Sequence, residues 1–213
     1  MRQVTAAGRR IEEASFAIID GEVGAHPFSP AEWQVVRRVI HATADLEFAR
    51  TIAFGEGAVA AGVAALRRGA PILCDVHMIA AGLSRERLAG FGSTVSCFIS
   101  DDDVVRAARE ADATRAAQAM RKAHRLRLLD GGIVAVGNAP TALAALQRLV
   151  CEEGAAPALV IGVPVGFVGA AEAKEAALAL PVPHVVARGR KGGTPVAVAI
   201  VNALLALAVE AET

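Results

Sequence analysis

Short apolar runs alternate with longer segments of helical periodicity from residue 71 onward. The runs predict β-strands at residues 71–74, 94–99, 132–136, 158–163 and 184–187. Between and after them, apolar residues recur every three or four positions, which is typical of helices that bury one face. These helices are predicted at residues 84–89, 103–111, 114–128, 140–151, 170–180 and 194–209. Because buried strands that alternate with helices form parallel sheets covered on both faces, the pattern predicts a three-layer α/β/α fold with a mainly parallel sheet of about five strands.

The part of the chain before residue 70 carries helical patterns only. One helix is predicted over residues 7–21, up to the turn at Asp20-Gly21, and another over residues 57–68, which Gly69 terminates. No internal repeat, low-complexity segment or linker interrupts the sequence. A single domain over residues 1–213 is therefore expected.

Residues 29–47 form the strongest predicted helix. Ser29 suits the N-cap, Pro30 the first helical position and Glu32 the acidic position of a capping box. Apolar residues cover roughly half of the helix circumference, so most of the helix is expected to be buried. The polar strip that remains consists of Gln34, Arg37, Arg38, His41 and Asp45.

Three members of this strip are spaced so that they can meet on one helix face. Arg38 precedes His41 by three positions, and Asp45 follows it by four. An imidazole between a cation and a carboxylate is a candidate acid/base centre. An exposed strip with an ordinary His–Asp pair has the same spacing, so the helix alone does not decide between the two.

Composition and charge exclude several classes of protein. Hydrophobic residues make up 54 % of the 213 residues, aromatic residues 4 %, and Tyr is absent, so Ala, Val, Leu and Ile must build the core. The 22 basic residues are balanced by 22 acidic ones, which argues against general nucleic-acid binding. The basic residues nevertheless occur in clusters, which leaves room for local anion sites.

The cysteines and the apolar stretches indicate a cytoplasmic protein. Cys74, Cys97 and Cys151 lie far apart, which suits a reducing compartment and gives no metal-binding signature. The N-terminal segment lacks the apolar centre of a signal peptide. The apolar stretch 196–209 is too short to cross a bilayer, so no membrane partner is expected.

Polar and glycine-rich loops follow the predicted strands. Ligands of parallel α/β folds gather at the carboxyl ends of the strands, where helix N-termini favour anions. Asn138, Arg190 and Lys191 lie in such loops, and Thr114-Arg115 opens a predicted helix, so these residues are candidates for anion contacts. Each segment also has an interpretation without a ligand. Residues 188–193 could form a flexible basic turn, and residues 114–115 could be a capping Thr followed by an exposed Arg. The segment from Asp75 to His77 is expected to be extended.

Familiar catalytic motifs are missing. No G-x-G-x-x-G follows a predicted strand and no G-x-x-x-x-G-K-[ST] occurs, so the loop at 189–193 suits carboxylates as well as phosphates. The five histidines show neither H-x-x-x-H nor H-E-x-x-H spacing, and no G-x-S-x-G is present. Zinc hydrolysis and acyl transfer through serine are therefore not expected.

Several motifs occur together and in one order along the chain. They are SFAII at 15–19, VIHATADLEFA at 39–49, GAPILCD at 69–75, Thr114-Arg115, GNAPTAL at 137–143, PVGFVGAAEAK at 164–174 and GRKGG at 189–193. Through them the sequence resembles the precorrin-8X methylmutase (precorrin isomerase) family of cobalamin biosynthesis over nearly its whole length. GNAPTAL and PVGFV are the most specific of these motifs.

The resemblance implies an intramolecular rearrangement. In this family a methyl group migrates from C-11 to C-12 of a corrin-like macrocycle, which yields hydrogenobyrinic acid, or cobyrinic acid in the cobalt-containing route. The family's essential histidine corresponds to His41, and its substrate-contacting serine and arginine correspond to Ser15 and Arg38. A homodimer with sites near the subunit interface and no added cofactor or metal is implied. A substrate with many carboxylates would explain clustered cations on a neutral protein.

Two positions depart from the family pattern, and one other function stays open. Ala116 and Ala173 stand where Ser is frequent in the family, which puts a hydrogen bond or two in doubt. A corrinoid carrier that binds the macrocycle without chemistry would share the ligand but not the catalytic role of His41. An unrelated anion-binding α/β enzyme would require both specific motifs to be coincidental.

Overall fold

A computed structural model describes residues 5–210 of the chain and shows a six-stranded sheet with the order β1-β6-β5-β4-β2-β3. The strands are β1 (Ile52–Phe54), β2 (Ile72–Cys74), β3 (Val95–Ser96), β4 (Ile133–Val136), β5 (Leu159–Gly162) and β6 (His184–Ala187). β1 pairs antiparallel with β6, and the other pairings are parallel. The predicted mainly parallel sheet is confirmed. The strand β1 was not predicted, because its three residues carry too little pattern to distinguish them from a loop.

Eleven helices connect and cover these strands within the described residues. They are α1 (Ala6–Val23), α2 (Pro30–Thr43), α3 (Phe48–Thr51), α4 (Ala58–Arg67), α5 (His77–Gly82), α6 (Arg85–Phe91), α7 (Asp102–Glu110), α8 (Arg115–Arg125), α9 (Pro140–Glu153), α10 (Ala170–Ala177) and α11 (Thr194–Glu210). The short helices α3 and α5 were not predicted. His77 begins α5, so the expected extended segment from Asp75 to His77 is wrong.

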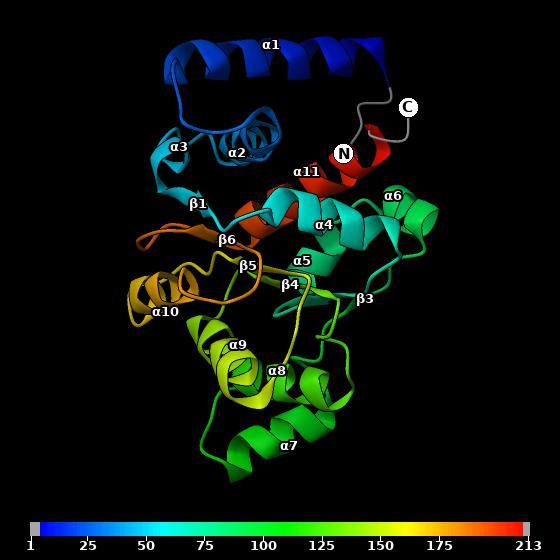
Figure 1. Ribbon diagram of the computed structural model, residues 1–213, viewed down its shortest axis with the longest axis vertical. Helices are drawn as coiled ribbons and strands as arrows, with labels where there is room; N and C mark the ends of the chain where they lie inside the picture. Colours follow the sequence, from blue (N-terminus) through cyan, green and yellow to red (C-terminus); the bar gives the residue numbers. More distant parts are fainter. Residues whose placement is uncertain (1–4, 211–213) are drawn as a thin grey trace.

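Two apolar cores separate the helices into layers. α2, α4, α5, α6 and α11 cover one face of the sheet, and α8, α9 and α10 cover the other (Figure 1). Along β4, Ile133 and Ala135 belong to the first core, whereas Val134 and Val136 belong to the second, as the alternation of side chains along a strand requires. The expected α/β/α arrangement is thereby confirmed. α1 lies outside these layers and packs on α2.

The amino end of α2 forms as its sequence predicts, and its carboxyl end does not. Ser29 N donates to Glu32 Oε2 at 2.9 Å and Glu32 N donates to Ser29 Oγ at 3.4 Å, which completes the capping box. The helix ends at Thr43 because Ala44 adopts the left-handed conformation, with φ of 53°. The predicted continuation to Glu47 is therefore wrong, and Asp45 lies beyond the helix.

A buried carboxylate joins β2 and β4 at the point where the strand order reverses. From β2 the chain continues to β3 on one side, and from β4 it continues to β5 and β6 on the other. Asp75, at the end of β2, accepts hydrogen bonds from the backbone N–H groups of Gly137, Asn138 and Ala139, at 3.0, 2.9 and 2.7 Å. These N–H groups at the start of α9 were expected to favour an anionic ligand. They bind the Asp75 side chain of the protein itself instead.

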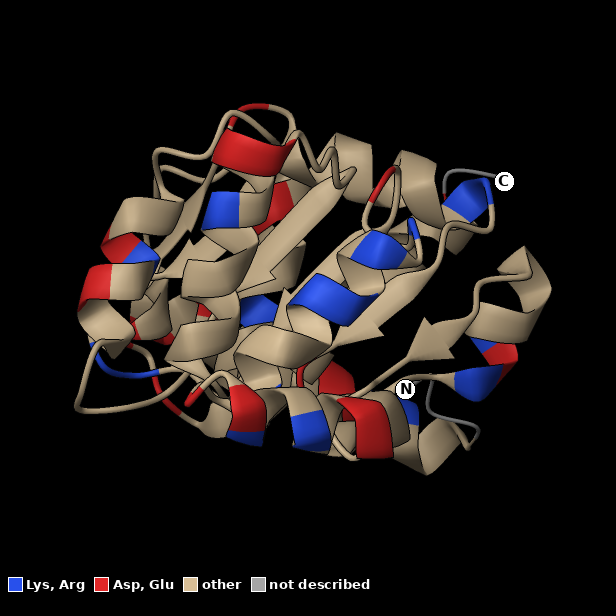
Figure 2. Ribbon diagram, turned by 90° about the horizontal axis from the view of Figure 1, so that it is seen from below, with Lys and Arg blue, Asp and Glu red and all other residues tan. Residues whose placement is uncertain are grey.

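The described residues hold no helix that is both long and apolar enough to cross a membrane. Basic and acidic segments are interspersed over the ribbons that face the viewer in Figure 2, without one large region of a single sign. This distribution agrees with the balance of charges in the sequence. Any anion site must therefore be built from a few local cations.

Replacing Asp75 by Ala is expected to lower the free energy of unfolding by about 3 kcal/mol, because three backbone N–H groups, one buried and two partly buried, lose their acceptor together. Asp75→Asn keeps an acceptor oxygen and should cost less. Urea unfolding of both variants measures the difference, and an Ala variant as stable as the unmodified protein would contradict this role.

Candidate active site

A pocket of about 400 Å³ lies between α1 and the carboxyl end of α2. Ser15, Ile18, Ile19, Glu22, Ile40, His41, Ala44 and Leu46 line it. The size falls within the range of small-molecule sites, and the lining combines apolar side chains with a few polar groups. The pocket is open on its outer side, where the His41 side chain is exposed.

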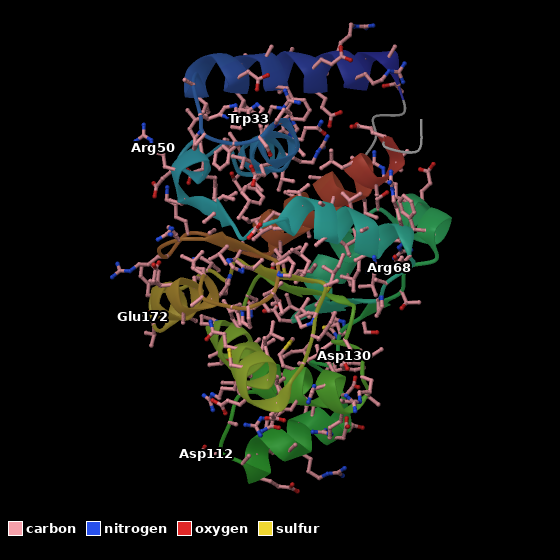
Figure 3. The ribbon with its side chains drawn as sticks, in the orientation of Figure 1. Trp33, Arg50, Arg68, Asp112, Asp130 and Glu172 are labelled. Atoms are coloured by element: carbon pink, nitrogen blue, oxygen red, sulfur yellow. The ribbon has the colours of Figure 1, made fainter. Side chains whose placement is uncertain are left out.

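His41 is held in the last turn of α2 by its packing against α1. Its ring lies edge-on to Phe16, with 5.2 Å between the ring centroids. The two helices are fixed to each other by Asp20, which accepts from Trp33 Nε1 at 2.9 Å and pairs with Arg37 at 2.9 Å. Figure 3 shows Trp33 in the layer between these helices. The backbone of His41 is therefore held in place, and its imidazole is accessible from the outer side of the pocket.

Ser15, for which the resemblance implies contact with the substrate, lines the same pocket as His41. Its hydroxyl donates to the carbonyl of Ile11 at 2.8 Å, one turn earlier in α1. That bond uses the only hydroxyl proton, so the oxygen is left to accept from a ligand. Glu22 also lines the pocket, and sequence reasoning missed it. The signal was its spacing of seven from Ser15, which places both side chains on one helix face.

Arg38 lies on the other side of Phe16 and is paired inside the protein. Its Nη1 atom is 3.0 Å from Glu12 Oε1, and its guanidinium carbon lies 5.3 Å from the centroid of the Phe16 ring. It lines a separate hollow of about 220 Å³ together with Glu12 and Arg37. A ligand carboxylate that binds Arg38 must therefore replace Glu12 as its partner.

Asp45 does not meet His41, which corrects the expectation of an Arg38–His41–Asp45 face. The left-handed Ala44 turns the chain away, and Asp45 Oδ2 accepts from Lys191 Nζ at 2.7 Å. The same ammonium group donates to Glu47 Oε2 at 2.7 Å. The hydrogen bond from Lys191 lowers the pKa of the Asp45 carboxyl.

Arg190 and Lys191 lie in the loop between β6 and α11. The loop is fastened to the segment after β5, because Gly166 N donates to the Arg190 carbonyl at 3.2 Å and Gly193 N donates to the Val163 carbonyl at 2.8 Å. The Arg190 guanidinium carbon lies 5.6 Å from the centroid of the Phe167 ring. This basic loop borders the His41 pocket through the salt bridges from Lys191 to the 44–47 turn.

Asn138, Thr114 and Arg115 lie farther along the carboxyl edge of the sheet. Asn138 has an exposed side chain at the start of the α9 segment, and Thr114 Oγ1 lies 2.7 Å from Thr141 Oγ1 in the first turn of α9. Thr114 also caps α8 by accepting from Ala117 N at 3.2 Å. Asp112, just before them, lies at the end of the molecule opposite α1 (Figure 3). The structure does not bring Thr114 and Arg115 into the His41 pocket.

Lys174 is a buried lysine that sequence reasoning passed over. It lies on α10 with a fully buried side chain, and its Nζ atom donates to the carbonyl of Lys191 at 2.7 Å. Burial lowers the pKa of the Lys174 amine from 10.5 to about 8. In the sequence AEAK it has the spacing of an ordinary polar position, so only the packing of α10 reveals its burial.

Comparison with known proteins assigns the family. The sequence profile described as precorrin-8X methylmutase matches residues 10–207. The chain is 48 % identical to the cobalt-precorrin-8 methylmutase of Leptospira interrogans, with 97 % of each chain covered. It is 43 % identical to the precorrin-8X methylmutase of Pseudomonas aeruginosa, with 92 % of this chain and 94 % of that one covered.

The fold leads to the same assignment. The crystal structure of precorrin-8X methylmutase from Thermus thermophilus superposes with a TM-score of 0.89 at 52 % identity, over 95 % of this chain and 97 % of that one. The chain belongs to the precorrin-8X methylmutase family. It is accordingly an isomerase of cobalamin biosynthesis, which confirms the resemblance drawn from its motifs. The family names support this methylmutase over a non-catalytic carrier.

The stability of this methylmutase is expected to depend on pH through Lys174. Between about pH 8 and pH 10.5 the unfolded chain keeps a proton that the folded chain has released, so this group makes folding more favourable as pH rises. The free energy of unfolding, measured relative to Lys174→Met, should therefore increase by about 2 kcal/mol between pH 7.5 and pH 9.5. Taking the difference between the two proteins removes the contributions of other titrating groups. A difference that stays constant across this range would contradict the burial of an ionisable amine.

Proposed function

We propose that this enzyme moves a methyl group from C-11 to C-12 of precorrin-8X, or of cobalt-precorrin-8, with His41 as the proton donor and acceptor. The observation that supports this most directly is the shared pocket of His41 and Ser15, which opens outward and is partly apolar. Relatives of both names occur at similar identity, so the proposal includes both the metal-free and the cobalt-containing macrocycle.

The chemistry requires proton transfer rather than a nucleophile. A methyl shift proceeds when the conjugated ring becomes electron-poor at the carbon that receives the group. An imidazolium that donates a proton to the ring achieves this by general-acid catalysis, and the neutral imidazole takes the proton back afterwards. Histidine suits this cycle because it exchanges protons near neutral pH. Ser15 and Arg38 then hold a substrate carboxylate or ring amide, with Glu12 released from Arg38.

The remaining candidates suit the periphery of a large polycarboxylate. Arg190 and Lys191 lie beside the turn that lines the pocket, and Asn138, Thr114 and Arg115 continue along the same edge of the sheet. Cations and hydrogen-bond donors along one edge match carboxylates arranged around a macrocycle. The pocket alone is too small to enclose such a ligand, so a further surface has to cover it.

We expect a second copy of the chain to provide that cover. α1 has 18 residues, of which only Ile19 is buried. Ile11 and Ile18 are 69 % and 61 % exposed on one face of this helix, and Leu46 is exposed at the rim of the pocket. Apolar side chains grouped around a site in this way are typical of interfaces. A cytoplasmic homodimer with its sites near the interface belongs to this proposal.

Replacing His41 by Ala is expected to abolish rearrangement while the substrate still binds, because the pocket and its cations stay in place. A loss of at least about 100-fold in turnover is expected for a general acid. The absorbance change of precorrin-8X on conversion measures the rate, and multiple turnovers by the unmodified enzyme exclude a stoichiometric carrier. His124→Ala is the matched control, since His124 lies on α8 beside Glu153 and should keep full activity. Normal turnover by His41→Ala would overturn the mechanism.

Replacing Ile18 by Asp is expected to convert the dimer to a monomer, because it buries a charge in the proposed interface. Sedimentation velocity measures the change. Leu126→Asp is the control: Leu126 is 53 % exposed at the end of α8, away from α1, and its replacement should leave the assembly intact. A dimer that survives Ile18→Asp, or an unmodified protein that is monomeric, would contradict the proposed interface.

A further inference from the structure

The environment of Lys174 is costly and needs an explanation. Its side chain is fully buried, yet the Nζ atom has one acceptor, the Lys191 carbonyl, and no carboxylate forms an ion pair with it in the part of the chain from residue 5 to 210. Buried amines are normally paired with a carboxylate, because removal of a charge from water is unfavourable. An apolar side chain of similar length would fill the same space without that cost. The hydrogen bond that the amine donates to the Lys191 carbonyl is therefore the feature that explains its burial.

This hydrogen bond holds the 189–193 loop, which contains no helix or strand. Residues 189–193 contain three glycines, and the backbone of Gly192 approaches the Val163 carbonyl so closely that a Cβ atom would collide with it. Besides the Lys174 bond, the loop is attached by Gly166 N to the Arg190 carbonyl and by Gly193 N to the Val163 carbonyl. The Lys174 bond lies between these two attachments and fixes the peptide that carries the Lys191 side chain.

The Lys191 side chain carries this constraint to the pocket. Its ammonium group binds Asp45 and Glu47, which flank Leu46 in the turn after α2. Ala44 and Leu46 of that turn line the His41 pocket. A continuous set of contacts thus runs from α10 through the basic loop to the wall of the pocket, although Lys174 itself is not among the lining residues.

We infer that Lys174 is a positioning residue, whose amine fixes the 189–193 loop and, through the Lys191 side chain, the turn that forms one wall of the His41 pocket. The inference rests on the proposed function for its kinetic consequences, but not for its structural ones. Lys174 does not touch the reacting atoms. It sets the position of Arg190, and of the turn that Lys191 holds, relative to His41, so that a carboxylate at the periphery of the substrate meets Arg190 with the ring in place.

The test is Lys174→Met, which keeps the length of the side chain and removes the donor. Since the loop and the turn that it holds would contact parts of the substrate remote from the migrating methyl group, the KM for precorrin-8X should rise about tenfold or more while kcat changes less. The thermal midpoint at pH 7.5 should stay the same or rise, because a poorly compensated buried amine is removed. Lys122→Met is the matched control: its Nζ atom, on α8, is bound by Asp101 and Asp103 and not by the 189–193 loop, and its loss should leave KM unchanged.

Amide hydrogen exchange provides a second readout that needs no substrate. In Lys174→Met the amides of Gly166 and Gly193, which hold the loop, should exchange faster, whereas the amide of Val163, bonded to the Val136 carbonyl at 2.9 Å, should not. Lys174→Gln keeps an N–H donor on a shorter side chain and should give an intermediate KM and intermediate exchange. If Lys174→Met does not fold, Lys174→Gln carries the test by the same two measurements.

The outcomes separate this inference from the proposed function. Unchanged KM and unchanged exchange in Lys174→Met overturn the positioning role. A rise in exchange over the whole chain, including Val163, also overturns it, because it shows a general loss of stability. If the unmodified protein converts neither macrocycle, the proposed function fails, and faster exchange confined to Gly166 and Gly193 still supports the link from Lys174 to the loop.

Discussion

The carboxylate of Asp75 joins the carboxyl ends of β2 and β4, at the edge of the sheet that also carries the 189–193 loop. It satisfies three backbone N–H groups of the segment that follows β4, at the point where the strand order reverses. Ligands of doubly wound α/β proteins often bind at such a reversal. Here an internal side chain occupies it, and burial raises the pKa of this carboxyl against the opposing effect of the three N–H groups. The reversal is thus a structural joint, and among the described residues the lining of the His41 pocket comes from α1 and from α2 and the turn after it instead.

Displacement of the site from the reversal gives a role to α1, which lies outside the layers, and to α2, on which it packs. α1 and α2 bring Ser15 and His41 together, and the chain then returns through the 44–47 turn to the carboxyl edge. Lys191 and Lys174 connect that turn to α10 in two steps. The candidate site is thus assembled from α1, α2, the 44–47 turn and the 189–193 loop rather than from one loop.

Much of the fold could be predicted because burial leaves a clear pattern. The apolar run that forms β4 and the capping box of α2 are local signals, and both are confirmed. The end of α2 could not be predicted, because Ala44 is not a residue that favours the left-handed conformation. The edge strand β1 depends on pairing with β6, which is remote in the sequence. Lys174 and Asp75 act through contacts with distant backbone groups, which no spacing in the sequence reveals.

The site residues came from two kinds of signal with different strengths. His41 stood out by residue type and helix position, but only the resemblance distinguished it from an exposed polar strip. Ser15 followed from the resemblance alone, and the structure places it in the same pocket. The predicted partnership with Asp45 was wrong because helical spacing was extended past the end of the helix. The catalytic and binding roles of these residues stay predictions.

The central claim is that the macrocycle binds against the imidazole of His41. The ring carbon–proton signals of the five histidines, assigned by single substitutions, can be followed by NMR while the rearranged product is added. The largest shift is predicted for His41, with little change at His124 and His184. Shifts that leave His41 unaffected, or that concentrate on another histidine, would contradict the placement of the site.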